Sequence, residues 1–180
     1  MKSITLLIPV YNEKSVLPQL FSRLDELAKS TPNYQFEFLF INDGSVDESL
    51  SIITNQAQKD TRISYINLSR NFGKEIAMLA GIDHAEGDAA VIIDADLQDP
   101  PELIKEMIAY WEDGYDDVYA RRSSRQGETW LKKKTSQWYY RILQKSTSIP
   151  IQINTGDFRL LDRRCIEALR QFRESQRNTK

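Results

Sequence analysis

The stretch Gly87-Asp88-Ala89-Ala90-Val91-Ile92-Ile93-Asp94-Ala95-Asp96-Leu97-Gln98-Asp99-Pro100-Pro101 decides which fold we expect for this chain. Residues 89–93 are a short, continuous apolar run with β-branched members, which is typical of a strand buried on both faces. Two carboxylates, Asp94 and Asp96, follow directly. Open α/β sheets bind their ligands at the carboxyl ends of their strands. The stretch therefore predicts a central buried strand with an acidic site at its carboxyl end.

The two carboxylates also indicate a metal site. Asp94 and Asp96 are two residues apart, so their side chains would point to the same side of a continuing strand. Their repulsion is relieved when a cation lies between them, and a hard divalent ion prefers oxygen ligands. Gln98 adds a third oxygen at the same spacing. We interpret the three residues as a Mg²⁺ or Mn²⁺ site that holds a diphosphate; a solvated acidic loop is the alternative.

Apolar runs and helical periodicities alternate along the rest of residues 1–121. This order predicts an α/β fold with a mostly parallel sheet and helices on both faces. The segment 154–159 is polar and turn-like, and a final amphipathic helix is expected from Asp162. Strands are expected at 3–10, 36–41, 63–68, 89–93 and near 117–120, and helices at 14–29, 45–59, 74–86 and 100–113.

Two of these helices carry capping-box patterns at their starts. Ser45 with Glu48, and Asp99 with Glu102, have the spacing at which a side chain and the helix start can cap each other. The single cysteine, Cys165, lies on the apolar stripe of the last helix, which indicates core packing rather than catalysis. His84, the only histidine, falls late in a helix and is expected at the surface or in its last turn.

Charge is distributed unevenly. The net charge of −2 gives no global case for nucleic-acid binding. Residues 121–145, however, are basic and interleaved with tryptophan, tyrosine and aliphatic residues. A basic helix with tryptophans at its apolar edge is typical of a membrane surface. A helix packed on the core with a solvated basic face is the alternative.

Four motifs now form a recognisable set: residues 9–13 (Pro-Val-Tyr-Asn-Glu), 42–47 (Asn-Asp-Gly-Ser-Val-Asp), 94–100 (Asp-Ala-Asp-Leu-Gln-Asp-Pro) and 156–159 (Gly-Asp-Phe-Arg). Together they resemble the inverting family 2 glycosyltransferases with the GT-A fold. Within that family the chain is most similar to polyprenyl-phosphate glycosyltransferases, which are bactoprenol glucosyltransferase-like enzymes related to dolichol-phosphate mannose synthase.

The resemblance covers essentially the whole chain and implies one GT-A catalytic domain over residues 1–180. Residues 1–121 would form the nucleotide-sugar-binding core, and residues 122–180 the acceptor and membrane-interface part. Family members usually continue into transmembrane helices, and no apolar run of that length occurs here. The resemblance therefore implies a soluble catalytic domain of a membrane protein, with the C-terminal transmembrane region missing.

The resemblance assigns the nucleotide pocket to the first two motifs. Asp43 is suited to accept the imide N–H of uracil, where family 2 enzymes use an aspartate for the base. Pro9, Tyr11 and Glu13 would line the nucleoside pocket, with Tyr11 offering a flat face and Glu13 an acceptor for ribose hydroxyls. Asn42 departs from the family, since many relatives have a second aspartate at this position.

The other two motifs carry the metal and sugar roles. Asp94, Asp96 and Gln98 match the family's D-x-D-x-Q, which binds the divalent ion and through it the diphosphate, so Asp94 serves the nucleotide and Asp96 the catalysis. Asp157 matches a family carboxylate near the sugar. We expect it to orient the donor or the acceptor, with general base as the weaker interpretation.

The acceptor is expected on the basic side. Arg122 and Arg125 follow the strand near residue 120, where the family has its acceptor-phosphate arginines, and guanidinium groups suit phosphate well. The implied reaction transfers a sugar, with UDP-glucose as the expected donor, to a polyprenyl (undecaprenyl) phosphate with inversion. The expected place is the cytoplasmic face of the bacterial inner membrane. The sequence leaves open which sugar is transferred and whether the full-length protein forms a homo-oligomer.

Four other functions have sequence requirements that can be compared with this chain. A mannosyltransferase would use GDP-mannose, and a family 2 enzyme with a hydroxyl acceptor would need a general base such as Asp157. A nucleotidyltransferase would need a glycine-rich loop after the first strand, where the sequence has Tyr11-Asn12-Glu13. A non-catalytic membrane scaffold would be recognised by loss of the aspartates, and all of them are present.

Overall fold

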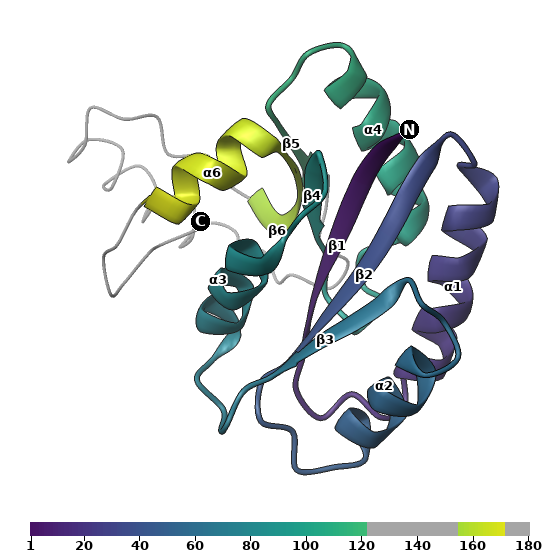
Figure 1. Ribbon diagram of the computed structural model, residues 1–180, viewed down its shortest axis with the longest axis vertical. Coiled ribbons are helices and arrows are strands. Elements are labelled where there is room, and N and C mark those ends of the chain that lie inside the picture. The colour runs from purple at the N-terminus through teal and green to yellow at the C-terminus, as the bar shows by residue number, and fades with distance from the viewer. Residues whose placement is uncertain (122–154, 172–180) are drawn as a thin grey trace, which may run out of the picture. The chain divides into compact units, whose positions relative to one another are not determined.

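The computed structural model describes residues 1–121 and 155–171. Within them, the strands form a single sheet in the order β3-β2-β1-β4-β6-β5 (Figure 1). The predicted basic helix within residues 121–145 lies outside the described residues, as do Arg122 and Arg125. The strands are β1 (Lys2–Val10), β2 (Tyr34–Asn42), β3 (Ile63–Asn67), β4 (Ala89–Ile92), β5 (Asp117–Arg121) and β6 (Thr155–Asp162).

The first four strands form the parallel part of the sheet, as predicted. β1 pairs in parallel with β2 and with β4, and β2 pairs in parallel with β3. Val10 lies opposite Asn42, and Asn42 opposite Asn67, while Leu7 lies opposite Ile92. The carboxyl ends of these strands therefore meet along one edge, and the loops that follow them are neighbours.

β6 is the main departure from the sequence prediction, which treated residues 154–159 as a turn. It runs antiparallel to β4, with Arg159 opposite Ile92 and Asp162 opposite Ala89. Its first three residues are polar and include glycine and aspartate, which are uncommon in strands. Phe158 and the leucines after it are buried, so only the second half of β6 has the composition of a strand.

The helices cover both faces of the sheet, as expected. α3 and α6 lie on one face, and α1, α2 and α4 lie on the other (Figure 1). Their bounds are α1 (Leu17–Ser30), α2 (Ser49–Ala57), α3 (Lys74–His84), the short 3₁₀ helix η1 (Pro101–Leu103), α4 (Ile104–Glu112) and α6 (Arg163–Gln171).

The core between α3, α6 and the sheet is built from apolar side chains of β1, β2, β4 and β6. Cys165 and Leu169 of α6 pack against this cluster, which confirms the core interpretation of the cysteine. His84 is exposed in the last turn of α3, also as expected. The fully or almost fully buried members are Leu7, Leu39, Ile41, Ala77, Met78, Ile82, Ala85, Ala90, Ile92, Leu161 and Ile166.

The capping box predicted for Ser45 and Glu48 is wrong, because α2 begins at Ser49 and Glu48 is itself the N-cap residue. The capping box predicted for Asp99 and Glu102 stays a prediction. No side chain caps α2 at Glu48 or η1 at Pro100. The Ser45 hydroxyl instead accepts the N–H of Asn12, and the Glu102 carboxylate binds the guanidinium of Arg23 on α1. For Ser45, a contact with a distant segment replaces the local one.

Residues 1–119 and 157–171 of the described chain belong to one compact unit, and residues 120–156 to a second. The predicted boundary at residue 121, between a donor part and an acceptor part, is a functional division and stays a prediction. In the part of the chain that the structure describes, no helix is long and apolar enough to cross a membrane. All side chains in the site below belong to the first unit.

Candidate functional site at the carboxyl edge of the sheet

An open pocket of about 270 Å³ lies where the parallel strands end. It brings together six residues that the sequence analysis singled out, from the ends of β1, β2 and β4. The segment before and at the start of α3 was not predicted to belong to the site, and it supplies Asn71, Gly73 and Lys74. The full lining is Pro9, Val10, Tyr11, Glu13, Asp43, Asn71, Gly73, Lys74, Asp94, Ala95 and Asp96.

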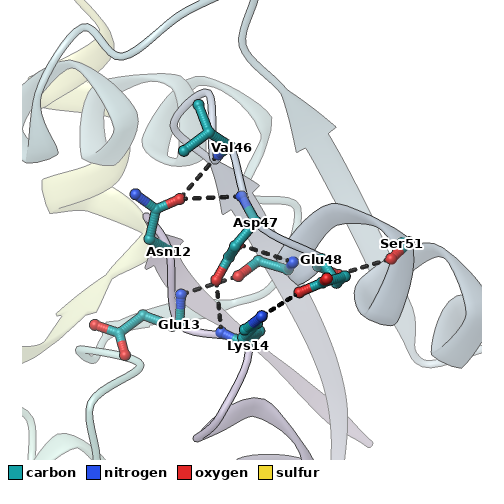
Figure 2. Close-up of polar contacts among 8 residues, drawn as sticks. Asn12, Glu13, Lys14, Val46, Asp47, Glu48 and Ser51 are labelled. Carbon is teal, nitrogen blue, oxygen red and sulfur yellow. Dashed lines mark hydrogen bonds and ion pairs between the residues drawn. The ribbon is translucent and has the colours of Figure 1, made fainter.

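The loop after β1 is fixed by Asn12, which has a positive φ of 56°. Asparagine tolerates this left-handed conformation better than most residues with a side chain. Its Oδ1 accepts the N–H of Val46 at 2.8 Å and that of Asp47 at 3.4 Å (Figure 2). Its own N–H donates to the Ser45 hydroxyl. The loop after β1 is therefore joined to the loop after β2.

The next residues continue this connection between the two loops. The N–H of Glu13 donates to the Ser49 hydroxyl at 2.9 Å, and the N–H of Lys14 donates to Asp47 at 3.2 Å. The Lys14 ammonium pairs with Glu48. Figure 2 shows the Glu13 carboxylate pointing away from these contacts. The backbone is thus held by one loop, while the carboxylate of Glu13 stays available to the pocket.

Asp43 is 3% exposed and holds the loop before α3. Its two carboxylate oxygens accept the N–H groups of Phe72 and Gly73, at 2.8 and 2.9 Å. Gly44, the next residue, has a φ of 65°, and a Cβ atom there would overlap the backbone of Arg70 and Asn71. The predicted base-binding residue is therefore also the residue that shapes the third side of the pocket.

Asp94 and Asp157 are joined by a residue that the sequence analysis did not select. The ammonium of Lys74 lies 2.5 and 2.7 Å from the two carboxylate oxygens of Asp94 and 2.8 Å from Asp157. Burial by itself lowers the pKa of Lys74, but its hydrogen bonds to Asp157 and Asp94 outweigh burial and raise that pKa overall. Lys74 is therefore a cation throughout the physiological pH range.

Of the three predicted metal ligands, two line the pocket and one does not. β4 ends at Ile92, so the expectation that Asp94 and Asp96 share one side of a continuing strand is wrong. The chain turns here because Leu97 adopts a positive φ of 61°, and Asp96 accepts the N–H of Gln98 at 3.0 Å. Asp94 and Asp96 nevertheless both line the pocket, whereas Gln98 is exposed and does not.

The pocket has more negative than positive charge. Burial raises the pKa of Glu13, and the charges of Asp96, Asp47 and Asp94 raise it further. Such a surplus of carboxylates favours a cation. Within residues 1–121 and 155–171, however, no group of three or more histidine, cysteine, aspartate or glutamate side chains is arranged to hold a metal ion. The metal assignment therefore stays a prediction.

Residues 5–170 match the family model of glycosyl transferase family 2. The chain belongs to this family and contains a glycosyltransferase domain. An uncharacterized glycosyltransferase of Synechocystis sp. is 50% identical over 175 residues, which cover 97% of this chain and 54% of that protein.

Two further proteins extend the comparison. The bactoprenol glucosyl transferase of Shigella phage SfV is 43% identical over 171 residues, which cover 95% of this chain and 55% of that protein. The chain thus spans about half the length of the curated relatives it matches. A solved mannosyltransferase from Pyrobaculum calidifontis, in complex with GDP-Man and Mn²⁺, superposes with a TM-score of 0.65 at 20% identity, covering 92% of this chain and 46% of that one. This likeness confirms the GT-A fold.

Replacing Gly44 with alanine tests the contact between the loops. Gly114 serves as the matched control because its φ is 97° and a Cβ there would meet nothing within 4 Å. We expect Gly114→Ala to cost about 1–2 kcal/mol of unfolding free energy from backbone strain alone. Gly44→Ala should cost roughly 1–3 kcal/mol more because the loop before α3 must move. Urea denaturation measures both values, and equal losses would contradict the close approach.

The variant Glu13→Gln tests whether the surplus of carboxylates in the pocket destabilises the protein, because its effect on stability should depend on pH. Because the folded state raises the pKa of Glu13, its ionisation destabilises the wild-type protein above that pKa, and the penalty disappears as pH falls below the ordinary value of 4.5. At pH 7 without divalent ions the variant should be more stable by about 0.5 kcal/mol, a small value because the side chain is partly exposed.

The advantage of Glu13→Gln should vanish below about pH 4, where both side chains are neutral. Glu26→Gln, on the exposed side of α1, makes the same change of net charge and is the control. Thermal unfolding from pH 3.5 to 8 measures both variants. A stability gain that is the same at every pH would show that the pocket carboxylates do not act on Glu13.

Proposed function

We propose that this chain is the catalytic domain of a polyprenyl-phosphate glycosyltransferase that transfers glucose from UDP-glucose to undecaprenyl phosphate with inversion. The observation that carries the proposal is the meeting of Asp94, Asp96 and Asp157 with Lys74 at the strand ends of a family 2 chain. The choice of acceptor and sugar is supported by the 43% identical relatives called bactoprenol glucosyl transferases.

The nucleoside would bind between the loops after β1 and β2. Pro9, Tyr11 and Glu13 line the pocket together with Asp43. The Asp43 carboxylate is held rigidly by two backbone N–H groups. Each carboxylate oxygen has a second lone pair, so it can still accept the imide N–H of uracil. A carboxylate that is fixed before the ligand arrives loses little freedom on binding.

The diphosphate would bind beside Asp94 and Asp96. Their carboxylates line the pocket and are oxygen donors of the kind that Mg²⁺ or Mn²⁺ prefers, whereas the predicted third ligand, Gln98, lies outside the pocket lining. When bound, the ion supplies compensation for the negative charge on the departing diphosphate. Asp94 and Asp96 would hold it, and Asp157 would orient the sugar or the acceptor next to them.

The acceptor is a phosphate that is already ionised at neutral pH, so it requires placement rather than deprotonation. Arg122 and Arg125, outside the described residues, are proposed to bind it as bidentate guanidinium donors. The basic, tryptophan-containing segment 128–145 would lie on the cytoplasmic surface of the inner membrane and present the lipid phosphate to them. The remaining length of the relatives leaves room for an anchor that the reaction itself would not need.

Thermal shift measurements test the donor and the metal together. UDP-glucose at about 100 times its Kd with Mn²⁺ or Mg²⁺ stabilises the folded state by roughly 2.7 kcal/mol, which is several degrees in Tm for a chain of this size. Asp96→Asn should lose the metal-dependent part of this shift. Asp113→Asn, an exposed carboxylate after α4, removes the same charge and should keep the full shift.

Three results would redirect the donor proposal. An unchanged metal-dependent shift in Asp96→Asn would remove Asp96 from the metal site. A larger shift with GDP-mannose than with UDP-glucose would move the mannosyltransferase alternative to first place. Transfer to a hydroxyl acceptor without any polyprenyl phosphate would favour the remaining family 2 alternative, with Asp157 as its base.

Arg122→Ala tests the acceptor side. With a short, water-soluble prenyl phosphate as acceptor, transfer should fall roughly 100-fold, because a charge-assisted bidentate contact is lost. The thermal shift with UDP-glucose should not change. Arg164→Ala, at a surface ion pair with Asp116, is the matched arginine control and should keep the wild-type rate. Loss of donor affinity in Arg122→Ala would place that guanidinium on the donor diphosphate instead.

A further inference from the structure

The ion pairs of Lys74 are unexpected on local grounds. Lys74 is the first residue of α3, where the positive end of the helix dipole disfavours a cation. Its ammonium is nevertheless partly buried between Asp94 and Asp157, with its side chain 37% exposed. A contact that overrides the local preference must come from the tertiary arrangement, so the reason for this lysine lies in the two carboxylates.

The backbone next to Lys74 is fixed by Asp43, another residue that lines the pocket. The residue before Lys74, Gly73, has a φ of 96° and donates its N–H to Asp43. Asp43 therefore holds the backbone from which the Lys74 side chain extends toward Asp94. This connects the residue proposed for the base with the residues proposed for the diphosphate and the sugar.

The two carboxylates would repel each other without a cation between them. An oxygen of Asp94 and one of Asp157 each lie within 2.8 Å of the Lys74 ammonium, so the two carboxylates are close to each other. Like charges this close disfavour each other's ionised forms. The Lys74 ammonium contacts both side chains, so one positive charge compensates the pair and sets their separation.

We propose that Lys74 is a positioning residue of the transfer site, which holds Asp157 against Asp94 and competes with the divalent ion for Asp94. The inference rests on the proposed function, in that Asp94 and Asp96 are taken to bind that ion. Lys74 contacts both oxygens of Asp94, at 2.5 and 2.7 Å, so an ion on this carboxylate lies close to the ammonium and is repelled by it. The contact with Asp157 can persist when the ion binds.

Mn²⁺ binding to the nucleotide-free chain, measured by electron paramagnetic resonance of the free ion, tests this competition without any turnover. Lys74→Met removes the charge and keeps most of the side-chain length, so Mn²⁺ should bind roughly tenfold more tightly, a modest figure because the site is partly exposed. Lys74→Arg keeps the charge and should bind Mn²⁺ within about twofold of the wild type.

The matched control is Lys2→Met. Lys2 pairs with Glu112 near the start of β1, away from the pocket, and its loss changes the net charge by the same amount. Its Mn²⁺ affinity should equal that of the wild type. Thermal unfolding provides a second readout: Lys74→Met should be less stable than the wild type in EDTA, and Mn²⁺ should restore most of the difference. If Lys74→Met does not fold, Lys74→Gln replaces it.

The results separate the two proposals. Wild-type affinity for Mn²⁺ in Lys74→Met, together with loss of binding in Asp96→Asn, would overturn the role of Lys74 and leave the metal site intact. An equal rise in affinity for Lys2→Met would also overturn it, because net charge alone would then explain the effect. Absence of Mn²⁺ binding in the wild type and in every Lys74 variant would overturn the metal-dependent function and the inference with it.

Discussion

The ion pair of Lys74 with Asp94 and Asp157 joins three segments that are far apart in the sequence: the start of α3, the turn after β4 and the start of β6. A parallel sheet collects the ends of its strands at one edge, and in this chain most of those ends carry carboxylates. Without a cation, their repulsion would oppose the strand pairing that brings them together. The carboxylates that would serve a metal-bound, phosphorylated ligand thus also oppose folding at this edge. The ammonium of Lys74 compensates their charge and so reduces this opposition.

A second set of interactions fixes the loops that line the pocket: polar side chains accept hydrogen bonds from backbone N–H groups of neighbouring loops. Asn12, Asp43 and Ser49 each accept such a group from another loop. The backbone N–H and C=O groups of a loop need hydrogen-bond partners. When a second loop supplies these partners, the bonds also fix the position of the two loops relative to each other. Tyr11 and Glu13, which lie between these anchors, can then point their side chains at a ligand. The short motifs after β1 and β2 therefore contain both structural and ligand-facing residues.

The sequence predicted the features that depend on local pattern. Apolar runs of the right length placed the parallel strands, and polar residues after them placed the pocket. It did not predict β6, because the strand begins with polar residues and glycine, Thr155 to Asp157, which are typical of a turn. Its apolar part begins only at Phe158. It did not predict the role of Lys74 or the hold of Asp43 on the loop before α3, because both depend on which segments meet in space. The capping box of Ser45 and Glu48 was wrong for the same reason, because Ser45 binds a distant segment that local spacing does not reveal.

The placement of Asp157 depends in turn on residues far from the pocket. In an antiparallel strand, a shift of register moves every side chain, so the end of β6 that carries Asp162 determines what lies beside Asp94. Trp111 donates to the carboxylate of Asp162 at 2.8 Å, and the guanidinium of Arg163 donates to the carbonyl of Ala85 at 2.9 Å. Arg170 donates to the same carbonyl and to that of Ile82, which also accepts the N–H of Ala85 at the end of α3. One set of contacts thus satisfies the last turn of α3 and fixes the register of β6. Since Lys74 is at the first turn of α3 and Asp157 is at the start of β6, the same contacts also fix both partners of the ion pair in the site.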